Sequence, residues 1–175
     1  MYLAIEECQI FGRFEFMIQR IQTIFLIFVI VVAYVNLWQD PVYAWFTAND
    51  NSNSNVLMFW HSYAGVVRDG NTMYTPDLMT AFFTIIMMIS GLITVFLFKN
   101  RRLQLKTAWI TLFAAILAVG VLYLRYFLLS LSNDNYTGQF SIHFLWPHFF
   151  VIFAALSVYN IRKDERLVRS MNRIR

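Results

Sequence analysis

The side chain that most strongly suggests chemistry in this sequence is Arg125, in the apolar stretch VLYLRYFLLS. A charge inside an apolar span costs about 2.5–3.5 kcal/mol on insertion scales, so an arginine there marks a candidate functional site. Arg125 lies six residues before the end of its stretch, which is roughly 9 Å at about 1.5 Å per residue. His148 lies at the corresponding depth of the next stretch, and Asn36 and Thr84 lie near the same layer of the two earlier ones. These four residues define a candidate polar cluster within a bundle of apolar helices.

A cluster of this composition suits a small-ligand or ion site, with Asp134, Asp40 or Asp77 as the counter-ion of the arginine. Pro147 leaves one backbone carbonyl without its helical donor, which predicts a kink or a polar opening nearby. A structural alternative exists, because an arginine can snorkel over this distance to the interface and polar side chains can tie helices together. The sequence leaves both interpretations open.

Patterns typical of catalysis or metal binding are absent from the sequence. His143 and His148 are five positions apart, about 140° around a helix, so they do not share a face as metal ligands. There is neither a His/Glu pair with zinc-protease spacing nor a glycine-rich phosphate loop, and the single Cys8 excludes a multi-cysteine zinc site. The apolar stretches lack carboxylates, which disfavours an Asp/Glu proton relay. We therefore expect a non-enzymatic protein with no catalytic residue, metal or cofactor.

Four long apolar stretches must position these residues. Hydrophobic residues make up 59% of the chain and charged residues 14%, against about 45–50% and 25% in soluble domains, so a bilayer must serve as part of the solvent. A membrane helix needs about 20 mostly apolar residues. The sequence predicts an all-α membrane protein with a four-transmembrane-helix bundle, whose spans lie at about 21–38, 78–98, 108–131 and 142–161.

The placement of lysine and arginine predicts the direction of the bundle. Twelve of the fourteen cationic residues adjoin the same ends of the four spans, and only Arg68 lies on the opposite side. We therefore expect both termini in the cytoplasm, the loops 39–77 and 132–141 outside, and the polar cluster in the outer half. The candidate basic face for anionic lipid or an acidic partner comprises Lys99, Arg101, Arg102, Lys106, Arg162, Lys163, Arg166, Arg169, Arg173 and Arg175.

The C-terminal tail, residues 162–175, places an arginine at every third or fourth position. On a helix this spacing makes one basic stripe opposite an apolar one, so we predict an amphipathic basic tail helix. Such a helix would lie along the inner leaflet, gaining about 1 kcal/mol per basic residue near anionic lipids. The alternatives are a solvated helix end that only sets the topology, and a surface for an acidic partner.

The loop 39–77 is longer than a simple connection. Asp69-Gly70 lies between two short runs rich in Val, Tyr and Thr, a pattern that predicts a two-residue β-hairpin turn. We expect a small outer-face hairpin that caps the helices, with a binding platform as the alternative. The sequence 132–141 is predicted to be a loop.

Three stretches together resemble one known family: MIQRIQTIF at 17–25, FLFKNRRLQLK at 96–106 and IRKDERLVRSMNRIR at 161–175. They are similar to the hallmark segments of a bacterial family of four-helix membrane proteins known as domain of unknown function 4293. The resemblance covers 17–175 and implies the fold, bacterial origin and an inner-membrane location, but no activity. It also implies that residues 1–16 are an extension before a single domain at 17–175, which leads to the hypothesis that translation begins at Met17.

The leading functional hypothesis is an accessory, assembly or scaffold protein of the bacterial inner membrane that uses its basic cytoplasmic face. Its expected partners are the anionic lipids of the inner leaflet and a membrane-protein partner or a second copy of the chain, with no nucleic acid. The alternative is a small transporter, sensor or lipid-handling protein that uses the polar layer around Arg125 and His148.

Overall fold

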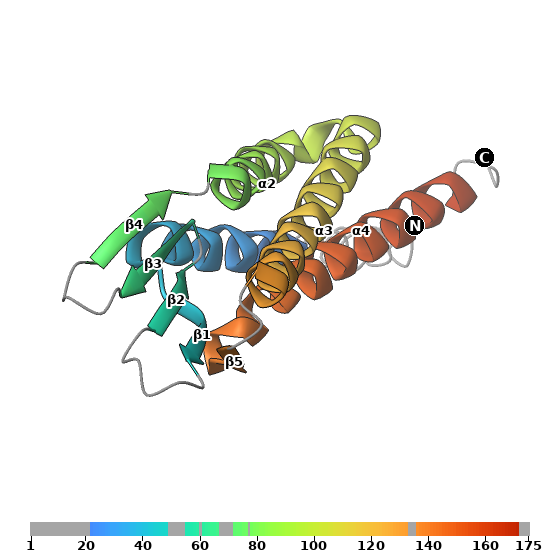
Figure 1. The fold of residues 1–175 in the computed structure, drawn as a ribbon. Coiled ribbons are helices and arrows are strands. Elements are labelled where there is room, and N and C mark those ends of the chain that lie inside the picture. The colour runs from blue at the N-terminus through green and yellow to red at the C-terminus, as the bar shows by residue number, and fades with distance from the viewer. Residues whose placement is uncertain are drawn as a thin grey trace, which may run out of the picture.

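The computed structural model describes residues 22–48, 55–59, 61–66, 72–76, 78–132 and 136–171 (Figure 1). Four of its helices are long and apolar enough to cross a membrane, as the composition predicts. They are the first helix Gln22–Gln39, α2 Leu78–Phe96, α3 Arg101–Ser132 and α4 Trp146–Met171, with short 3-10 helices η1 Leu97–Lys99 and η2 Ile142–Leu145.

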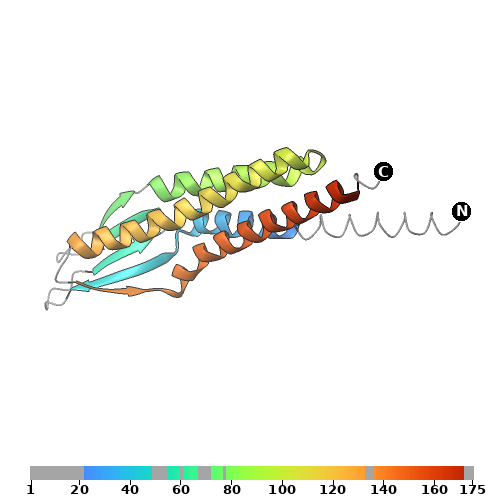
Figure 2. The same cartoon turned by 90° about the vertical axis from the view of Figure 1, so that its right-hand side faces the viewer.

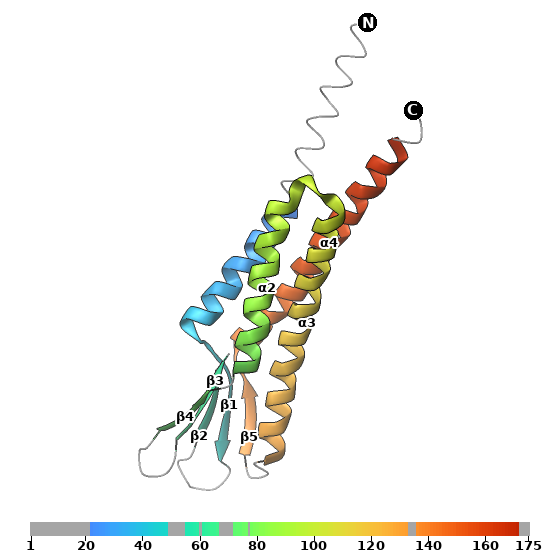
Figure 3. The same cartoon turned by 90° about the horizontal axis from the view of Figure 1, so that it is seen from above.

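The four helices lie side by side, with a β-sheet at one end (Figure 3). We call this the sheet end, and we call the opposite end, where α2 joins α3 and where α4 finishes, the basic end. α2 has 19 residues, or about 28 Å, which matches a hydrocarbon core of about 30 Å. α3 has 32 residues, or about 48 Å, and therefore continues past α2 along the sheet.

α4 shows two differences from the sequence-based expectations. It runs without interruption to Met171, so the described part of the tail extends the last helix instead of forming a separate segment, as Figure 2 also shows. Pro147 is the second residue of α4 and follows the 3-10 helix η2. The first turn of a helix has no intrahelical acceptors for its N–H groups, so a proline there costs no hydrogen bond and marks the helix start, not a kink.

The sheet is larger than the predicted hairpin. It has five antiparallel strands in the order β4-β3-β2-β1-β5. The strands are β1 Val42–Ala48, β2 Asn55–Phe59, β3 Ser62–Val66, β4 Thr72–Pro76 and β5 Tyr136–Phe140. The pairing of β3 with β4 confirms a hairpin between these two runs; the predicted two-residue turn at Asp69-Gly70 lies outside the described residues. The prediction that 132–141 is only a loop is wrong, because β5 pairs with β1 from Ala44↔Phe140 to Ala48↔Tyr136.

The sheet docks onto the helices through aromatic rings. Tyr126 of α3 stacks on Phe140 of β5 at 4.3 Å between ring centroids and contacts Phe46 of β1 at 5.2 Å. Phe140 in turn lies 4.4 Å from Phe144 of η2. Gly138 allows this close approach, because a Cβ atom there would meet the Tyr126 hydroxyl at 2.6 Å and the Phe46 ring at 2.8 Å.

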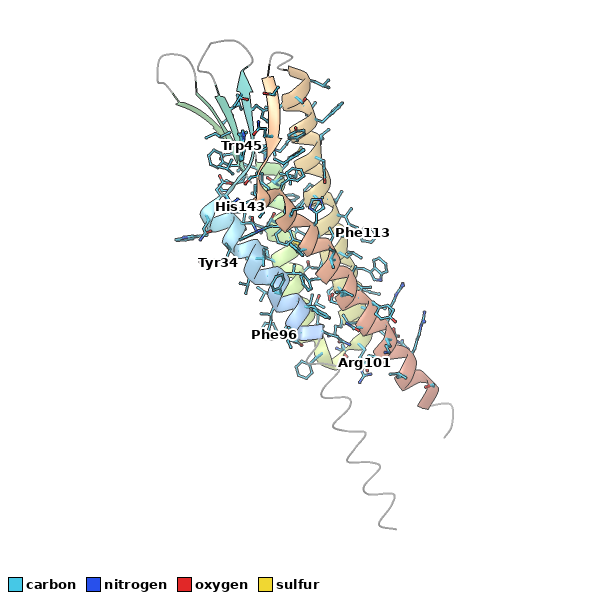
Figure 4. The ribbon with its side chains drawn as sticks, turned by 90° about the horizontal axis from the view of Figure 1, so that it is seen from below. Tyr34, Trp45, Phe96, Arg101, Phe113 and His143 are labelled. Carbon is cyan, nitrogen blue, oxygen red and sulfur yellow. The ribbon has the colours of Figure 1, made fainter. Side chains whose placement is uncertain are left out.

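The bundle turns large apolar side chains outward. Ile24, Phe82, Phe113 and Ile152, one from each long helix, are each at least 50% exposed. Figure 4 shows Phe113 and Tyr34 on the periphery of the bundle. A continuous apolar surface of this kind is unusual on a soluble monomer and compatible with contact to lipid.

Candidate functional site

Arg125 is buried where the bundle meets the sheet. Its guanidinium donates from Nη2 to the Ser62 carbonyl at 3.0 Å and from Nη1 to the Thr80 hydroxyl at 3.4 Å, and only 7% of the residue is exposed. Thr80 is the third residue of α2, so Arg125 lies at the sheet end of α2. α3 continues for seven residues beyond Arg125 beside the sheet, so Arg125 lies level with the start of α2 although it is well inside α3.

Asp40 organises the turn that connects the first helix to β1. Its φ of 41° is in the left-handed region, which aspartate adopts more readily than most residues. Its Oδ1 accepts from the His61 backbone N–H at 3.0 Å and lies 3.1 Å from His61 Nδ1, and its Oδ2 accepts from the Ser62 hydroxyl at 2.8 Å. Asp40, one of the three predicted counter-ions, is thereby linked to Arg125 through Ser62. Asp77 and Asp134 lie outside the described residues.

Thr84 and Asn36 are both buried, but they belong to different contacts. The Thr84 hydroxyl donates to the Thr80 carbonyl at 2.6 Å, so Thr84 and Arg125 meet at Thr80. Asn36 donates to the Val32 carbonyl at 2.7 Å and accepts a short hydrogen bond from the Tyr43 hydroxyl. Burial, assisted by the Asp40 carboxylate, raises the pKa of Tyr43. The phenol therefore stays protonated and remains a donor.

His148 lies near the level of Arg125 but on the other side of α3. Its Nε2 is 2.8 Å from the hydroxyl of Tyr123, two residues before Arg125, or about 200° away around the helix. Its Nδ1 is 3.1 Å from the Phe144 carbonyl. A carbonyl only accepts, so the Nδ1 atom that faces Phe144 carries a proton, and both ring nitrogens of His148 have partners within the protein. The structure thus brings Arg125 together with Thr84 and separates both from His148.

His148 also borders an apolar groove between α3 and α4. The groove has a volume of about 350 Å³, and its other lining residues are Ile116, Val119, Val151 and Ile152. The Tyr123–His148 pair adjoins this otherwise apolar groove, whose lining suits an apolar chain or ring.

A seam of hydroxyl groups between α2 and α3 was missed by the sequence analysis. Thr111 donates to Ser90 at 3.0 Å, and Thr94 donates to Thr107 at 2.8 Å. The sequence pattern that could have revealed this seam is the spacing of hydroxyl residues along one face of α2, at Thr80, Thr84, Ser90 and Thr94. The fully buried Met87 lies between Thr84 and Ser90, so these hydroxyls tie the two helices together and do not form a continuous polar path.

The basic end contains cations in two different situations. Arg101, at the start of α3, pairs with the buried Asp164 of α4 at 3.1 Å, and the Arg162 guanidinium lies 4.8 Å from the centre of the Trp109 ring. Arg102 and Lys106, in contrast, are exposed. Figure 4 shows Arg101 at the end of the bundle opposite Trp45. Of the other predicted basic residues, the structure describes the side chains of Lys163 and Arg166 but not those of Lys99, Arg169, Arg173 and Arg175.

Four apolar helices joined to a small sheet define a class of protein compatible with multiple passes through a membrane. The chain belongs to the family described as a domain of unknown function (DUF4293), whose model matches residues 18–174. This match confirms the resemblance carried by the three hallmark stretches. No curated protein matches the chain.

Proposed function

We propose that this is an integral protein of a bacterial inner membrane, with both termini in the cytoplasm, and that it acts as a non-enzymatic accessory, assembly or scaffold protein. Its working surface would be the basic end. The proposal rests on the uneven distribution of charged residues along the bundle. The exposed cations Arg102, Lys106, Lys163 and Arg166 lie at one end, the sheet lies at the other, and apolar side chains face outward between them.

The contacts at the sheet end support a structural role for most of the predicted polar cluster. Arg125, Thr84 and Asn36 are all buried, and each is hydrogen-bonded within the protein. Donors and acceptors used in this way stabilise the junction and leave less capacity for a ligand. The exposed cations of the basic end then become the stronger candidates for binding anionic lipid or an acidic partner.

The orientation can be tested with single cysteines in a Cys8→Ser background. Thr137→Cys marks the sheet end, and Ser170→Cys marks the basic end. A membrane-impermeant maleimide should label position 137 in intact cells and position 170 only after permeabilisation. The reverse labelling would contradict a cytoplasmic basic end, and labelling of both positions in intact cells would contradict a folded, inserted bundle.

The scaffold role can be tested by purification in mild detergent. The tag belongs at the sheet end, and co-purifying proteins are identified by mass spectrometry. A stoichiometric partner should be lost from a variant with Lys163→Glu and Arg166→Glu and retained by a matched variant with Thr137→Glu and Gln139→Glu. Absence of any partner from the wild-type protein would remove the support for an assembly role.

A second candidate function, a lipid-handling or small-molecule-binding protein, is favoured by the groove beside His148. His148 lies at the border of this groove, and Ile116 and Val151 contribute to its apolar walls. His148→Leu should reduce a co-purifying small molecule while charge reversal at the basic end leaves it unchanged. The opposite ranking would favour the scaffold role.

A further inference from the structure

The C-terminal part of α4 carries a hollow with a volume of about 440 Å³. Among the residues that the structure describes, its lining consists of Tyr159, Arg162, Lys163, Arg166, Leu167 and Ser170. We propose that this hollow binds the phosphodiester headgroup of an anionic phospholipid. The inference rests on the proposed function, because it requires the basic end to lie at the headgroup level of a membrane.

The charges around the hollow are arranged to attract a phosphate. Arg162 is held beside the ring of Trp109, with its guanidinium carbon 4.8 Å from the ring centre. Lys163 and Arg166 are exposed, and neither pairs with a carboxylate within the described part of the chain. The nearby Asp164 is turned toward α3, where Arg101 pairs with it at 3.1 Å. Guanidinium groups bind phosphate oxygens in a bidentate way, and a lysine adds a point charge, so this set suits a phosphodiester.

The depth of the hollow along α4 matches a headgroup. The apolar span begins with the four residues of η2 at Ile142 and continues into α4 at Trp146. With about 2.0 Å per residue in a 3-10 helix and about 1.5 Å in an α-helix, Arg162 lies roughly 32 Å from Ile142. A hydrocarbon core is about 30 Å thick. The hollow therefore begins where the hydrocarbon ends.

The same face of α4 continues from the hollow into the apolar region. Ile152, Leu156 and Tyr159 are all exposed, and with Lys163 they follow the spacing of one helix face. An acyl chain can lie along the two aliphatic side chains, with the tyrosine at the interface and the phosphate in the hollow. A free phosphate ion would use only the basic half of this surface, which favours a lipid as the occupant.

The test is lipid retention by the full chain, purified in mild detergent and measured by native mass spectrometry. Phosphatidylglycerol and phosphatidylethanolamine are added in parallel. The wild-type protein should retain phosphatidylglycerol preferentially. A variant with Lys163→Gln and Arg166→Gln should retain it roughly tenfold less, because each basic residue contributes severalfold to binding of anionic lipid. The matched control has Thr137→Glu and Gln139→Glu, which lowers the net charge of the protein by the same amount at the sheet end, and it should retain the preference.

Three results would overturn the proposal. Equal losses in both variants would mean that only the net charge of the protein matters. Unchanged retention in both would mean that the hollow does not bind the headgroup. Displacement of phosphatidylglycerol by millimolar inorganic phosphate would assign the hollow to a free anion.

Folding is monitored by circular dichroism, and a variant with Lys163→Arg and Arg166→Lys should bind like the wild type because it keeps both charges. If the double variant with Lys163→Gln and Arg166→Gln does not fold, the two single variants provide the same comparison. The cysteine labelling at position 170 separates the two proposals. A wild-type protein that shows no preference for phosphatidylglycerol, together with correct labelling, refutes only the headgroup site. Labelling of position 170 in intact cells refutes the proposed function even if lipid binding persists in detergent.

Discussion

The two ends of the bundle use arginine in opposite ways. At the sheet end, Arg125 is buried and donates to Ser62 and Thr80, which belong to the sheet and to α2. At the basic end, Arg166 is exposed beside a hollow and has no carboxylate partner within the described residues. A guanidinium surrounded by fixed acceptors stabilises the fold, whereas one on an open surface remains free to bind a ligand.

The basic end itself repeats this contrast within two adjacent residues. Arg101 pairs with the buried Asp164 and joins α3 to α4, while Arg102 is exposed. Residue type and approximate depth therefore do not separate structural from functional cations. Structural and functional cations are distinguished by the group that each side chain contacts.

The largest expected effect follows from Arg125→Met. This change removes two hydrogen bonds that a charged donor makes, one to the part-buried Ser62 carbonyl and one to the buried Thr80 hydroxyl. The free energy of unfolding in detergent should fall by about 3 kcal/mol, measured by reversible denaturation. Arg125→Lys is the control, and it should recover part of the loss. If the Arg125→Met variant is as stable as the wild type, the contrast between the two ends of the bundle fails. Arg125 then becomes a candidate ligand-binding residue again.

Gly138→Ala should have the next largest effect. The added Cβ would lie 2.6 Å from the Tyr126 hydroxyl and 2.8 Å from the Phe46 ring, so the sheet must shift away from α3. Overpacking of this kind costs about 2 kcal/mol, measured as a lower melting temperature. The matched change Gly120→Ala should be tolerated, because no atom lies within 4 Å of its Cβ position. Equal melting temperatures for the two variants would mean that the aromatic contact does not hold the sheet in place.

The pair Arg101 and Arg102 sharpens the comparison at the basic end. Arg101→Gln removes the ion pair between Arg101 and the buried Asp164 carboxylate. The expected loss is about 1–2 kcal/mol, between the values for exposed and fully buried pairs. Arg102→Gln should change stability by less than about 0.5 kcal/mol, because the side chain is exposed. Similar unfolding curves for the two variants would remove the distinction between structural and free cations at this end.

The smallest effect is expected from Tyr43→Phe, which removes the hydrogen bond to Asn36 at a cost of about 1 kcal/mol. Burial raises the pKa of Tyr43 in the folded state. Its contribution to stability is therefore complete below about pH 10, the ordinary pKa of tyrosine, and declines as the pH rises above that value. Unfolding measured from pH 8 to 11 should show a smaller decline in Tyr43→Phe than in the wild type. Parallel declines would mean that other groups account for the alkaline loss.

Much of the fold could be predicted because its signals are local. An apolar stretch of about 20 residues predicts a membrane-length helix, and this prediction does not depend on how the rest of the chain packs. The β3–β4 hairpin depends on two adjacent strands and the turn between them, so a short sequence window contains all the information it needs. β5 could not be found in this way, because its five residues pair with β1 about 90 positions earlier in the chain.

The sequence alone determined the four apolar helices and the concentration of basic residues at their ends, since both follow from composition and spacing along the chain. The tertiary structure decided which polar residues meet. It turned Arg125 toward α2 and β3, paired His148 with Tyr123 on the other side of α3, and buried Asp164 against Arg101. These contacts depend on how each helix is rotated about its axis and on the register of the sheet. Both are set by packing between segments far apart in the chain, and the spacing of residues within one segment does not specify them.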